Sequence, residues 1–475
     1  MATKQTILEK VIISSNDAPF EVPVNWVWCE LGGISNFIDY RGKTPTKTDE
    51  GIKLITAKNV KNNQLNGEPE EFIAEEDYEK WMTRGIPKFG DILFTTEGPL
   101  GNVAQLNIEG KVALAQRIVT IQTKMNKEFL KYVLLSKSIQ KVINSFATGT
   151  TVKGIKASNL KKIPIPIPPI KEQKRIVDSL DFSFCRISEV SGYLFKAKKF
   201  LEERHEALLK IAFRGELVNQ DDSITNNFGL LNFIQEELMK EKKKKIEINP
   251  IAAEEQPYDI PESWVYLRIG DIIKITGGSQ PTKSIFKYKY EEGYTRLVQI
   301  RDFKSNDYLT YVPNEYANRP FKEDDVMIGR YGPPVFQILR GLSGTYNVAL
   351  MKAEVNPNIM TNDYLYYLLQ EPRIQKAVIK DSARSSGQTG IRRELLESIV
   401  ISIPPIEEQK KIVERLDIEF EKEKEIKFNI EQLEMQLKKM QESILQKSIR
   451  GELVEQRIEE GMGLDLLKEM IEKNL

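Results

Sequence analysis

Two copies of one fourteen-residue stretch constrain this chain more than any other feature. One copy runs from Pro168 to Asp181 and the other from Pro404 to Asp417, so their numbering differs by 404 − 168 = 236. Ten of the fourteen positions are identical, and most of the others keep their charge or polarity. Such agreement indicates an internal duplication, so we expect the two halves to share one fold.

Each copy predicts the start of a long helix. A proline pair suits the first turn, and the acidic Glu172 and Glu408 follow where the helix dipole favours them. Apolar residues then recur at alternating spacings of three and four, which is typical of a coiled-coil seam. Both runs close on Arg-Gly-Glu-Leu-Val, where Gly215 and Gly451 are natural helix ends. We expect helices of about 43 residues, or about 65 Å.

The seam is predicted to serve both helix pairing and partner docking. It comprises Ile176, Leu180, Ile187, Leu194, Leu201, Leu208, Ile412, Leu416, Ile426, Leu433, Leu437 and Ile444. Arg204, Glu423 and Lys447 interrupt it. An antiparallel pair is favoured, because the second globular segment lies between the end of one helix and the start of the other. The connection 219–256 is long enough for other routes, so two separate helices, each packed on its own domain, remain the alternative.

The predicted fold class is mixed α/β (α+β). Two similar domains are joined by two long helices that form an antiparallel coiled coil, with a pseudo-two-fold internal repeat. The predicted segments are a lead-in (1–22), a first domain (23–168), a first spacer helix (169–218), a linker with a helix at 230–245 (219–256), a second domain (257–404), a second spacer helix (405–454) and a C-terminal helix (455–475).

Within each domain, strand-like runs precede a helical run. In the first domain they lie at 53–57, 91–95, 112–115 and 118–122, before a helix at 129–145. Their counterparts are 296–300, 325–329 and 348–353, before a helix at 362–379. Trp26 and Trp264 occupy matching positions and are expected to anchor the two cores.

Charge and cysteine content limit the class of protein. The chain carries 69 basic and 69 acidic residues, which argues against a free-standing nucleic-acid binder. A basic bias over 129–171 nevertheless recurs over 373–393, so a phosphate-facing surface is expected there. The two cysteines, Cys29 and Cys185, are expected to be unpaired. With neither a membrane-span pattern nor a signal-peptide core, the sequence predicts a cytoplasmic location.

The sequence offers no recognisable catalytic or metal-binding pattern. The one histidine, His205, falls in the predicted seam beside Arg204, which argues against general-base chemistry. Gly42-Lys43-Thr44-Pro45 is only a fragment of a phosphate-binding loop. Glycine-rich loops at 147–155 and 384–391 permit either phosphate contact or an ordinary turn. We therefore expect a binding subunit with no catalytic residues and no metal site.

The duplicated Pro-Pro-x-x-Glu-Gln-x-x-Ile-Val stretch, with its long helix closing on Arg-Gly-Glu-Leu, resembles the specificity subunit of type I DNA restriction-modification enzymes. The resemblance covers nearly the whole chain. It implies two target-recognition domains that each read half of a bipartite double-stranded DNA site, with a coiled coil that sets the gap. It also implies two methyltransferase subunits and restriction subunits as partners. Those partners, and not this chain, would bind S-adenosylmethionine, ATP and Mg²⁺.

We choose the candidate DNA-binding residues by their placement within the loops. The choice also uses the common pairings of Arg with guanine and of Asn or Gln with adenine. The candidates are Arg41, Lys43, Lys58, Asn59, Thr96, Thr148, Lys153, Lys156, Ser279, Gln280, Arg301, Arg330, Tyr331, Ser386, Gln388, Arg392 and Arg393. One alternative is a related system in which cleavage and methylation share one partner chain. Another is an assembly scaffold whose duplicated domains bind protein, which predicts no salt-dependent DNA binding.

Overall fold

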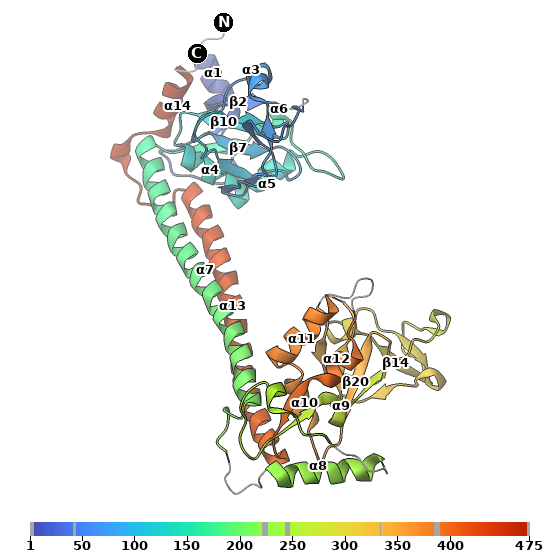
Figure 1. Ribbon diagram of the computed structural model, residues 1–475. Helices are drawn as coiled ribbons and strands as arrows, with labels where there is room; N and C mark the ends of the chain where they lie inside the picture. The colour runs from blue at the N-terminus through green and yellow to red at the C-terminus, as the bar shows by residue number, and fades with distance from the viewer. Residues whose placement is uncertain are drawn as a thin grey trace. The chain divides into compact units, whose positions relative to one another are not determined.

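The computed structural model divides into two compact units. It describes residues 4–40, 44–220, 227–242, 248–332, 334–383 and 390–472. Unit 1 contains Met1–Leu194 and Glu431–Leu475, and unit 2 contains Phe195–Ile430. Each unit therefore combines one globular domain with part of both long helices, α7 (Ile170–Phe213) and α13 (Ile406–Ile449) (Figure 1).

Unit 1 is organised around a four-stranded antiparallel sheet in the order β2-β10-β7-β8. Its strands are β2 (Ser35–Asp39), β10 (Ile118–Thr123), β7 (Ile92–Thr95) and β8 (Val103–Gln105). In a second sheet, β3 (Ile52–Ile55) pairs with β6 (Phe72–Ile73) and, in parallel, with β9 (Ala113–Leu114). Two further pairs are β4 (Val60–Lys61) with β5 (Gln64–Leu65), and β1 (Val27–Glu30) with β11 (Pro164–Ile167). Its helices are α1 (Lys4–Val11), α2 (Leu31–Ile34), α3 (Tyr78–Trp81), α4 (Lys127–Leu135), α5 (Lys137–Ser145), α6 (Ala157–Leu160) and α14 (Gly463–Glu472).

Unit 2 repeats this plan. Its main sheet has the order β13-β20-β17-β18, made of β13 (Ile273–Gly277), β20 (Leu350–Val355), β17 (Val326–Gly329) and β18 (Gln337–Leu339). A second sheet joins β15 (Tyr311–Pro313), β14 (Tyr294–Val298), β19 (Gly344–Tyr346) and β16 (Pro320–Phe321), and β12 (Val265–Arg268) pairs with β21 (Val400–Ile403). Its helices are α8 (Asn227–Lys242), α9 (Ile269–Ile272), α10 (Asn362–Leu368), α11 (Pro372–Ser382) and α12 (Arg393–Ser398).

The two strand orders correspond one to one, which confirms the duplication at the level of fold. In both units the parallel pair of the second sheet also recurs, as β3 with β9 and as β14 with β19. The predicted core tryptophans are confirmed, because Trp26 and Trp264 are buried in the main cores of unit 1 and unit 2.

The helical runs predicted at 129–145 and 362–379 are each two helices. In unit 1 the break lies at Ser136, whose hydroxyl donates to the Val133 carbonyl oxygen at 2.7 Å. In unit 2 Pro372 begins α11, because a proline suits the first helical turn and not the interior. Equivalent amides, Gln140 and Gln375, donate to the last carbonyls of the preceding helices. The apolar periodicity that predicted each run did not reveal these short breaks.

Within each unit the two long helices pack in opposite directions. In unit 1 the start of α7 shares a core with the end of α13, through Ile176 and Ile449. In unit 2 the end of α7 shares a core with the start of α13, through Phe213 and Ile412. The predicted lengths are close to the 44 residues observed for each helix.

The seam in unit 2 is more polar than predicted. Ile426 is 45% exposed, so it does not fill the buried position assigned to it, and the same holds in unit 1 for Leu433 at 46%. Glu419 and Glu423 are buried instead. Arg204 of α7 pairs with Glu419, and the His205 ring nitrogen lies 3.1 Å from Glu423. The remaining predicted seam residues are buried or half-buried.

Gly215 and Gly451 end the long helices as predicted. Both adopt the left-handed region, with φ of +78° and +73°. A Cβ at Gly215 would lie 2.4 Å from the Pro261 ring, and one at Gly451 would lie 2.4 Å from the Pro23 ring. Backbone conformation and space therefore both require glycine at these positions.

We predict that Gly215→Ala lowers the free energy of unfolding of the chain by roughly 1–3 kcal/mol, because alanine is strained at positive φ. Gly192→Ala is the matched control, since Gly192 lies inside α7 and a Cβ added there would meet nothing within 4 Å. That substitution should be neutral or slightly stabilising. Urea unfolding of both variants checks this. Equal midpoints for the two variants would contradict the prediction.

A buried glutamate in the first turn of each long helix accepts a hydrogen bond from the segment that follows the end of the other long helix. Glu172 accepts hydrogen bonds from Asn25 at 3.1 Å and from Gln456 at 2.6 Å. Glu408 accepts from Trp264 at 3.0 Å and from Gln220 at 2.7 Å. The first lies wholly within unit 1 and the second within unit 2. Burial raises the pKa of Glu172 above its ordinary value of 4.5, against the lowering effect of its hydrogen bonds.

The raised pKa predicts how stability depends on pH. Between the ordinary and the raised pKa of Glu172 the folded state binds more protons than the unfolded state, so stability falls as pH rises through this window. We expect Glu172→Gln to remove this dependence, so the variant gains stability relative to the wild type as pH rises through this window. Thermal unfolding at several pH values checks this. A stability difference that is constant with pH would contradict it.

Candidate nucleic-acid interface

Loops at the ends of the central strands converge in unit 1. The N–H of Thr96, just after β7, donates to the Arg117 carbonyl oxygen at 3.0 Å, just before β10. The N–H of Ile155 donates to the Thr96 carbonyl oxygen at 3.0 Å, and Thr148 and Gly154 exchange two backbone hydrogen bonds. Backbone groups therefore hold the glycine-rich loop predicted at 147–155 against the strand ends.

Unit 2 brings together the equivalent loops. The Arg330 N–H donates to the Ala349 carbonyl oxygen at 2.8 Å, and the Ser279 N–H donates to the Tyr346 carbonyl oxygen at 3.1 Å. Of the loop predicted at 384–391, the described Gly390 lies against the Tyr331 ring. The described parts of the predicted loops thus lie at equivalent strand ends in the two units.

A pocket of about 200 Å³ opens in the unit 1 surface. Its polar lining includes Lys58, Gln116 and Arg117 together with Thr44 and Lys47. The Arg117 Nε lies 3.0 Å from the Glu97 carboxylate, and the Lys47 Nζ lies 2.7 Å from that of Glu71. The Lys47 and Arg117 side chains are about half exposed, so they can donate hydrogen bonds to a nucleic-acid base or phosphate.

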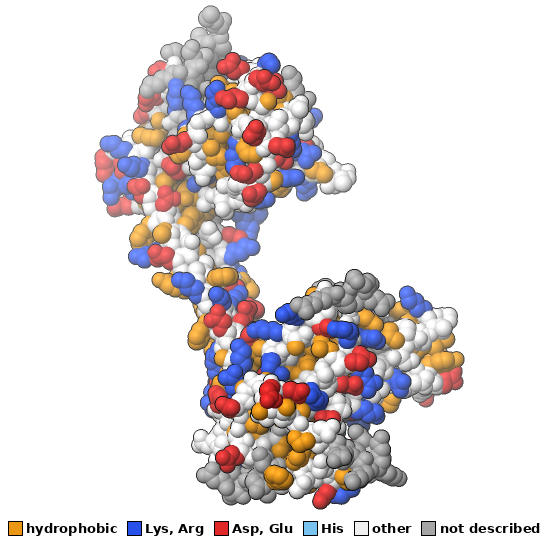
Figure 2. Space-filling view, viewed as in Figure 1, with side chains coloured by type: hydrophobic (Ala, Val, Ile, Leu, Met, Phe, Trp, Pro, Cys, Tyr) orange, Lys and Arg blue, Asp and Glu red, His pale blue; other side chains and the backbone are white. Residues whose placement is uncertain are grey.

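The unit 2 surface mixes exposed tyrosines with basic side chains. Tyr288, Tyr290 and Tyr308 are 72%, 68% and 67% exposed. The Arg301 guanidinium lies 5.3 Å from the Tyr308 ring centroid. Figure 2 shows Lys and Arg side chains interspersed with hydrophobic ones on the visible face of this unit. Stacking rings beside cations are typical of nucleic-acid contact. These tyrosines were absent from the predicted set, which was chosen by loop placement and by hydrogen-bonding side chains.

The predicted DNA-binding residues fall into five groups. Lys58, Thr148, Lys153, Lys156, Gln280 and Arg301 are exposed, and Ser279, Arg330 and Tyr331 are half-buried. Asn59 and Thr96 are buried. Arg392 and Arg393 are exposed but ion-paired with Asp381 and Glu397, and the exposed Arg301 lies 3.8 Å from the Asp302 carboxylate. Arg41, Lys43, Ser386 and Gln388 lie outside the described residues.

The structure corrects the predictions for Asn59 and Thr96. The Asn59 side-chain oxygen accepts from the N–H and hydroxyl of Thr56 at 2.9 and 2.8 Å, and its amide donates to two backbone carbonyls. Thr96 is 2% exposed, and its hydroxyl donates to the Arg117 carbonyl oxygen at 3.4 Å. In unit 2 the buried Asp302 closes the equivalent turn by accepting from the Gln299 N–H. These side chains shape the loops and cannot reach a base from where they lie.

The predicted basic surface is partly directed at the long helices. Lys137 lies 3.7 Å from Glu442 of α13, and Lys376 lies 3.2 Å from Glu206 of α7. Arg373 pairs with the buried Glu371 and donates to the Val400 carbonyl oxygen. These three cations therefore offset helix and core carboxylates, which narrows the phosphate-facing surface to the loops.

The comparisons with known proteins agree on one family. The family model for the type I restriction modification DNA specificity domain matches residues 23–184 and 261–435, which is more than half of the chain. The chain belongs to this family. Similar curated proteins include the type I restriction enzyme EcoBI specificity subunit of Escherichia coli, 25% identical over 438 residues (90% of this chain, 85% of the relative). The MjaIX specificity subunit of Methanocaldococcus jannaschii is 25% identical over 452 residues (93% and 95%).

Two solved structures share the fold of this specificity subunit. One comes from work on complex assembly and conformational transition of the type I R-M system, with a TM-score of 0.67. The other is the HsdS subunit from Thermoanaerobacter tengcongensis, with a TM-score of 0.54. Each is 20% identical and covers 92% of this chain and 100% of its own. The family match therefore establishes DNA sequence recognition as the role of the specificity subunit.

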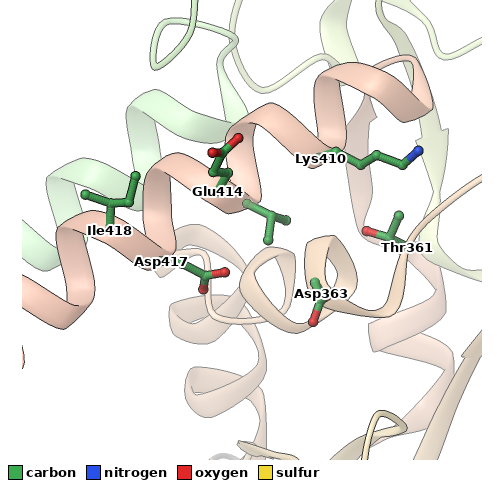
Figure 3. Close-up of a pocket in the computed structure, with 7 residues that line it drawn as sticks. Thr361, Asp363, Lys410, Glu414, Asp417 and Ile418 are labelled. Atoms are coloured by element: carbon green, nitrogen blue, oxygen red, sulfur yellow. The ribbon is translucent and has the colours of Figure 1, made fainter.

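A second type of surface lies on the outer face of the long helices. In unit 2 a groove of about 420 Å³ is lined by the first turns of α13 and the start of α10 (Figure 3). Its residues are Thr361, Asp363, Lys410, Val413, Glu414, Asp417 and Ile418. The Tyr367 hydroxyl donates a hydrogen bond to the Asp417 carboxylate. Burial raises the pKa of this hydroxyl most, and the hydrogen bond to Asp417 raises it further.

The residues that line this groove have counterparts in unit 1. In the duplicated stretch and just after it, the equivalents of Lys410, Glu414, Asp417 and Ile418 are Lys174, Asp178, Asp181 and Phe182. Tyr132 donates to Asp181 as Tyr367 does to Asp417. Phe182 and Ile418 are 65% and 44% exposed. A repeated exposed apolar residue beside a repeated charge pattern is typical of a protein-docking surface.

The described residues contain no group of His, Cys, Asp and Glu that could hold a metal ion. His205 stacks on Phe420 with ring centroids 4.2 Å apart, within the helix pair as predicted. Neither cysteine forms a disulfide, which confirms that prediction. Among the described helices of the specificity subunit, none has the length and apolar composition needed to cross a bilayer.

Neighbouring residues Lys58 and Asn59 allow a direct test of the loop assignment. We predict that Asn59→Ala lowers the free energy of unfolding by roughly 1–3 kcal/mol, because it leaves buried polar groups unpaired. Lys58→Ala should leave stability unchanged and reduce the slope of log binding constant against log salt by about 0.9, the value for one phosphate contact. Urea unfolding and DNA binding of the assembled complex at several salt concentrations check both. Equal stability losses in the two variants would contradict the assignment.

Proposed function

We propose that each unit reads one half of a bipartite double-stranded DNA site. The observation that carries this proposal is that both units build the same loop convergence and place different side chains on it. Lys58 in unit 1 stands where unit 2 has Arg301. The buried Thr96 stands where unit 2 has the half-buried Arg330, so only unit 2 presents a cation at that strand end. A shared scaffold with different polar groups suits two readers of different sequences.

The proposal extends to the partners of the chain. Two methyltransferase subunits would dock on the repeated residues at the starts of α7 and α13, one at each start, and restriction subunits would join them. The repeated charges and the exposed Phe182 and Ile418 support two copies of one partner. The partners would supply the catalytic residues and bind S-adenosylmethionine, ATP and Mg²⁺. The complex would work in the cytoplasm, and its helix pair would set the gap between the half-sites.

Methylation mapping tests this function. The chain is expressed with its adjacent methyltransferase subunit, and methylated adenines are located by single-molecule sequencing. We expect a bipartite motif with a fixed gap. Arg301→Ala should relax one half of that motif by about 5- to 150-fold, the discrimination that one base contact provides, and leave the other half unchanged.

Lys304→Ala is the control, because Lys304 is an exposed cation three positions further along the chain and outside the predicted reading set. It should leave both halves of the motif unchanged. A stable and active wild-type complex that methylates no bipartite site would contradict the proposed function.

A further inference from the structure

One arginine stands at the same pair of strand ends in each unit, but on opposite strands. In unit 1 the paired residues are Thr96 after β7 and Arg117 before β10. In unit 2 the equivalent pair is Arg330 after β17 and Ala349 before β20. The backbone hydrogen bond that defines the pair is 3.0 Å in one unit and 2.8 Å in the other. The backbone hydrogen bond is therefore the same in both units, but the arginine precedes β10 in unit 1 and follows β17 in unit 2.

The residue after the first strand end holds the guanidinium in both units. In unit 1 this residue is Glu97, whose carboxylate lies 3.0 Å from the Arg117 Nε. In unit 2 it is Tyr331, whose ring centroid lies 5.2 Å from the Arg330 guanidinium carbon. An ion pair and a cation–π contact thus serve the same purpose, because each limits the rotamers of a long side chain.

A glycine of the neighbouring loop makes room for this holding residue. A Cβ on Gly154 would lie 3.3 Å from the Glu97 Cβ, and a Cβ on Gly390 would lie 3.0 Å from the Tyr331 ring. The two glycines occupy the same place in the duplication, because their numbers differ by 390 − 154 = 236, as those of the two proline pairs do. The holding residue, the guanidinium and the glycine loop therefore form one repeated arrangement.

Both guanidinium groups retain hydrogen-bonding capacity. The Arg117 side chain is 52% exposed and lines the unit 1 pocket beside Gln116 and Lys58. The Arg330 Nε is buried and has no hydrogen-bond partner among the described residues. Because Glu97 offsets the charge of Arg117, the electrostatic attraction of this arginine for a phosphate is weaker than that of an unpaired lysine. Its planar fork of donors still matches the N7 and O6 acceptors of guanine.

We propose that Arg117 and Arg330 are the equivalent base-reading arginines of the two domains, and that each recognises a guanine in the major groove. Glu97 and Tyr331 are positioning residues. This inference rests on the proposed function and adds to it the residue and the base class read at one position of each half-site. It also adds Arg117, which was not among the predicted DNA-binding residues, to the base-reading residues.

Methylation by the complex of this chain with its methyltransferase subunit tests the inference. The wild-type motif is mapped first, and Arg117→Ala is then mapped on the same genomic DNA. We expect one G·C position in one half-site to lose discrimination by about 5- to 150-fold, with the other half-site and the gap unchanged. Arg330→Ala should relax one G·C position of the other half-site.

Two further variants separate reading from folding. Arg117→Lys keeps the charge and loses the fork, so it should fold, assemble and relax the same position. Glu97→Gln should weaken discrimination at that position by a smaller factor, without changing it elsewhere. Lys80→Ala is the control, because Lys80 forms an exposed ion pair with Asp77 and lines no part of the pocket. It should leave the motif unchanged.

The possible outcomes are distinct. An unchanged motif in Arg117→Ala and Arg117→Lys, with both complexes assembled, would overturn the inference and leave the proposed function intact. Uniformly weaker methylation at all positions would also overturn it, because that result identifies a phosphate contact. A wild-type complex without a bipartite motif would remove the proposed function itself, and the inference with it.

Discussion

The structure depends on the buried carboxylate in the first turn of each long helix. Glu172 and Glu408 each accept hydrogen bonds from a residue near the start of their own domain and from the glutamine that follows the end of the other helix. A buried carboxylate is costly unless such donors surround it. Each interaction therefore specifies which helix end belongs beside which helix start, and it favours the antiparallel pairing that each unit displays.

Much of this arrangement could be predicted from the duplication. The long helices, their glycine ends and the core tryptophans follow from local rules of helix geometry and burial. The seam was harder, because its period alone assigned Ile426 and Leu433 to buried positions. Partner residues from the opposite helix decide which side chains are buried, and Arg204 and His205 favour carboxylates at 419 and 423. Those cross-helix pairs have no signature in either helix alone.

The reading surface shows the same division between local and tertiary information. The sequence located the loops, since a shared scaffold leaves matching glycines and strand ends. It did not separate Lys58 from Asn59, because burial is decided by the turn that Asn59 itself closes. Arg117 was absent from the predicted set for a different reason. Loops of different length shift the offset between the halves, so the offset to its counterpart Ala349 is 349 − 117 = 232 rather than 236.

The loops are held to the strand ends by backbone hydrogen bonds, among them that from the Thr96 N–H to the Arg117 carbonyl oxygen. Backbone groups are the same whatever side chain a residue carries. The side chains at these positions can therefore change by single mutations without loss of the scaffold. Selection can alter the target of one domain while the other domain and the helix pair keep theirs. A lineage of such proteins can diversify its recognition sequences one half-site at a time.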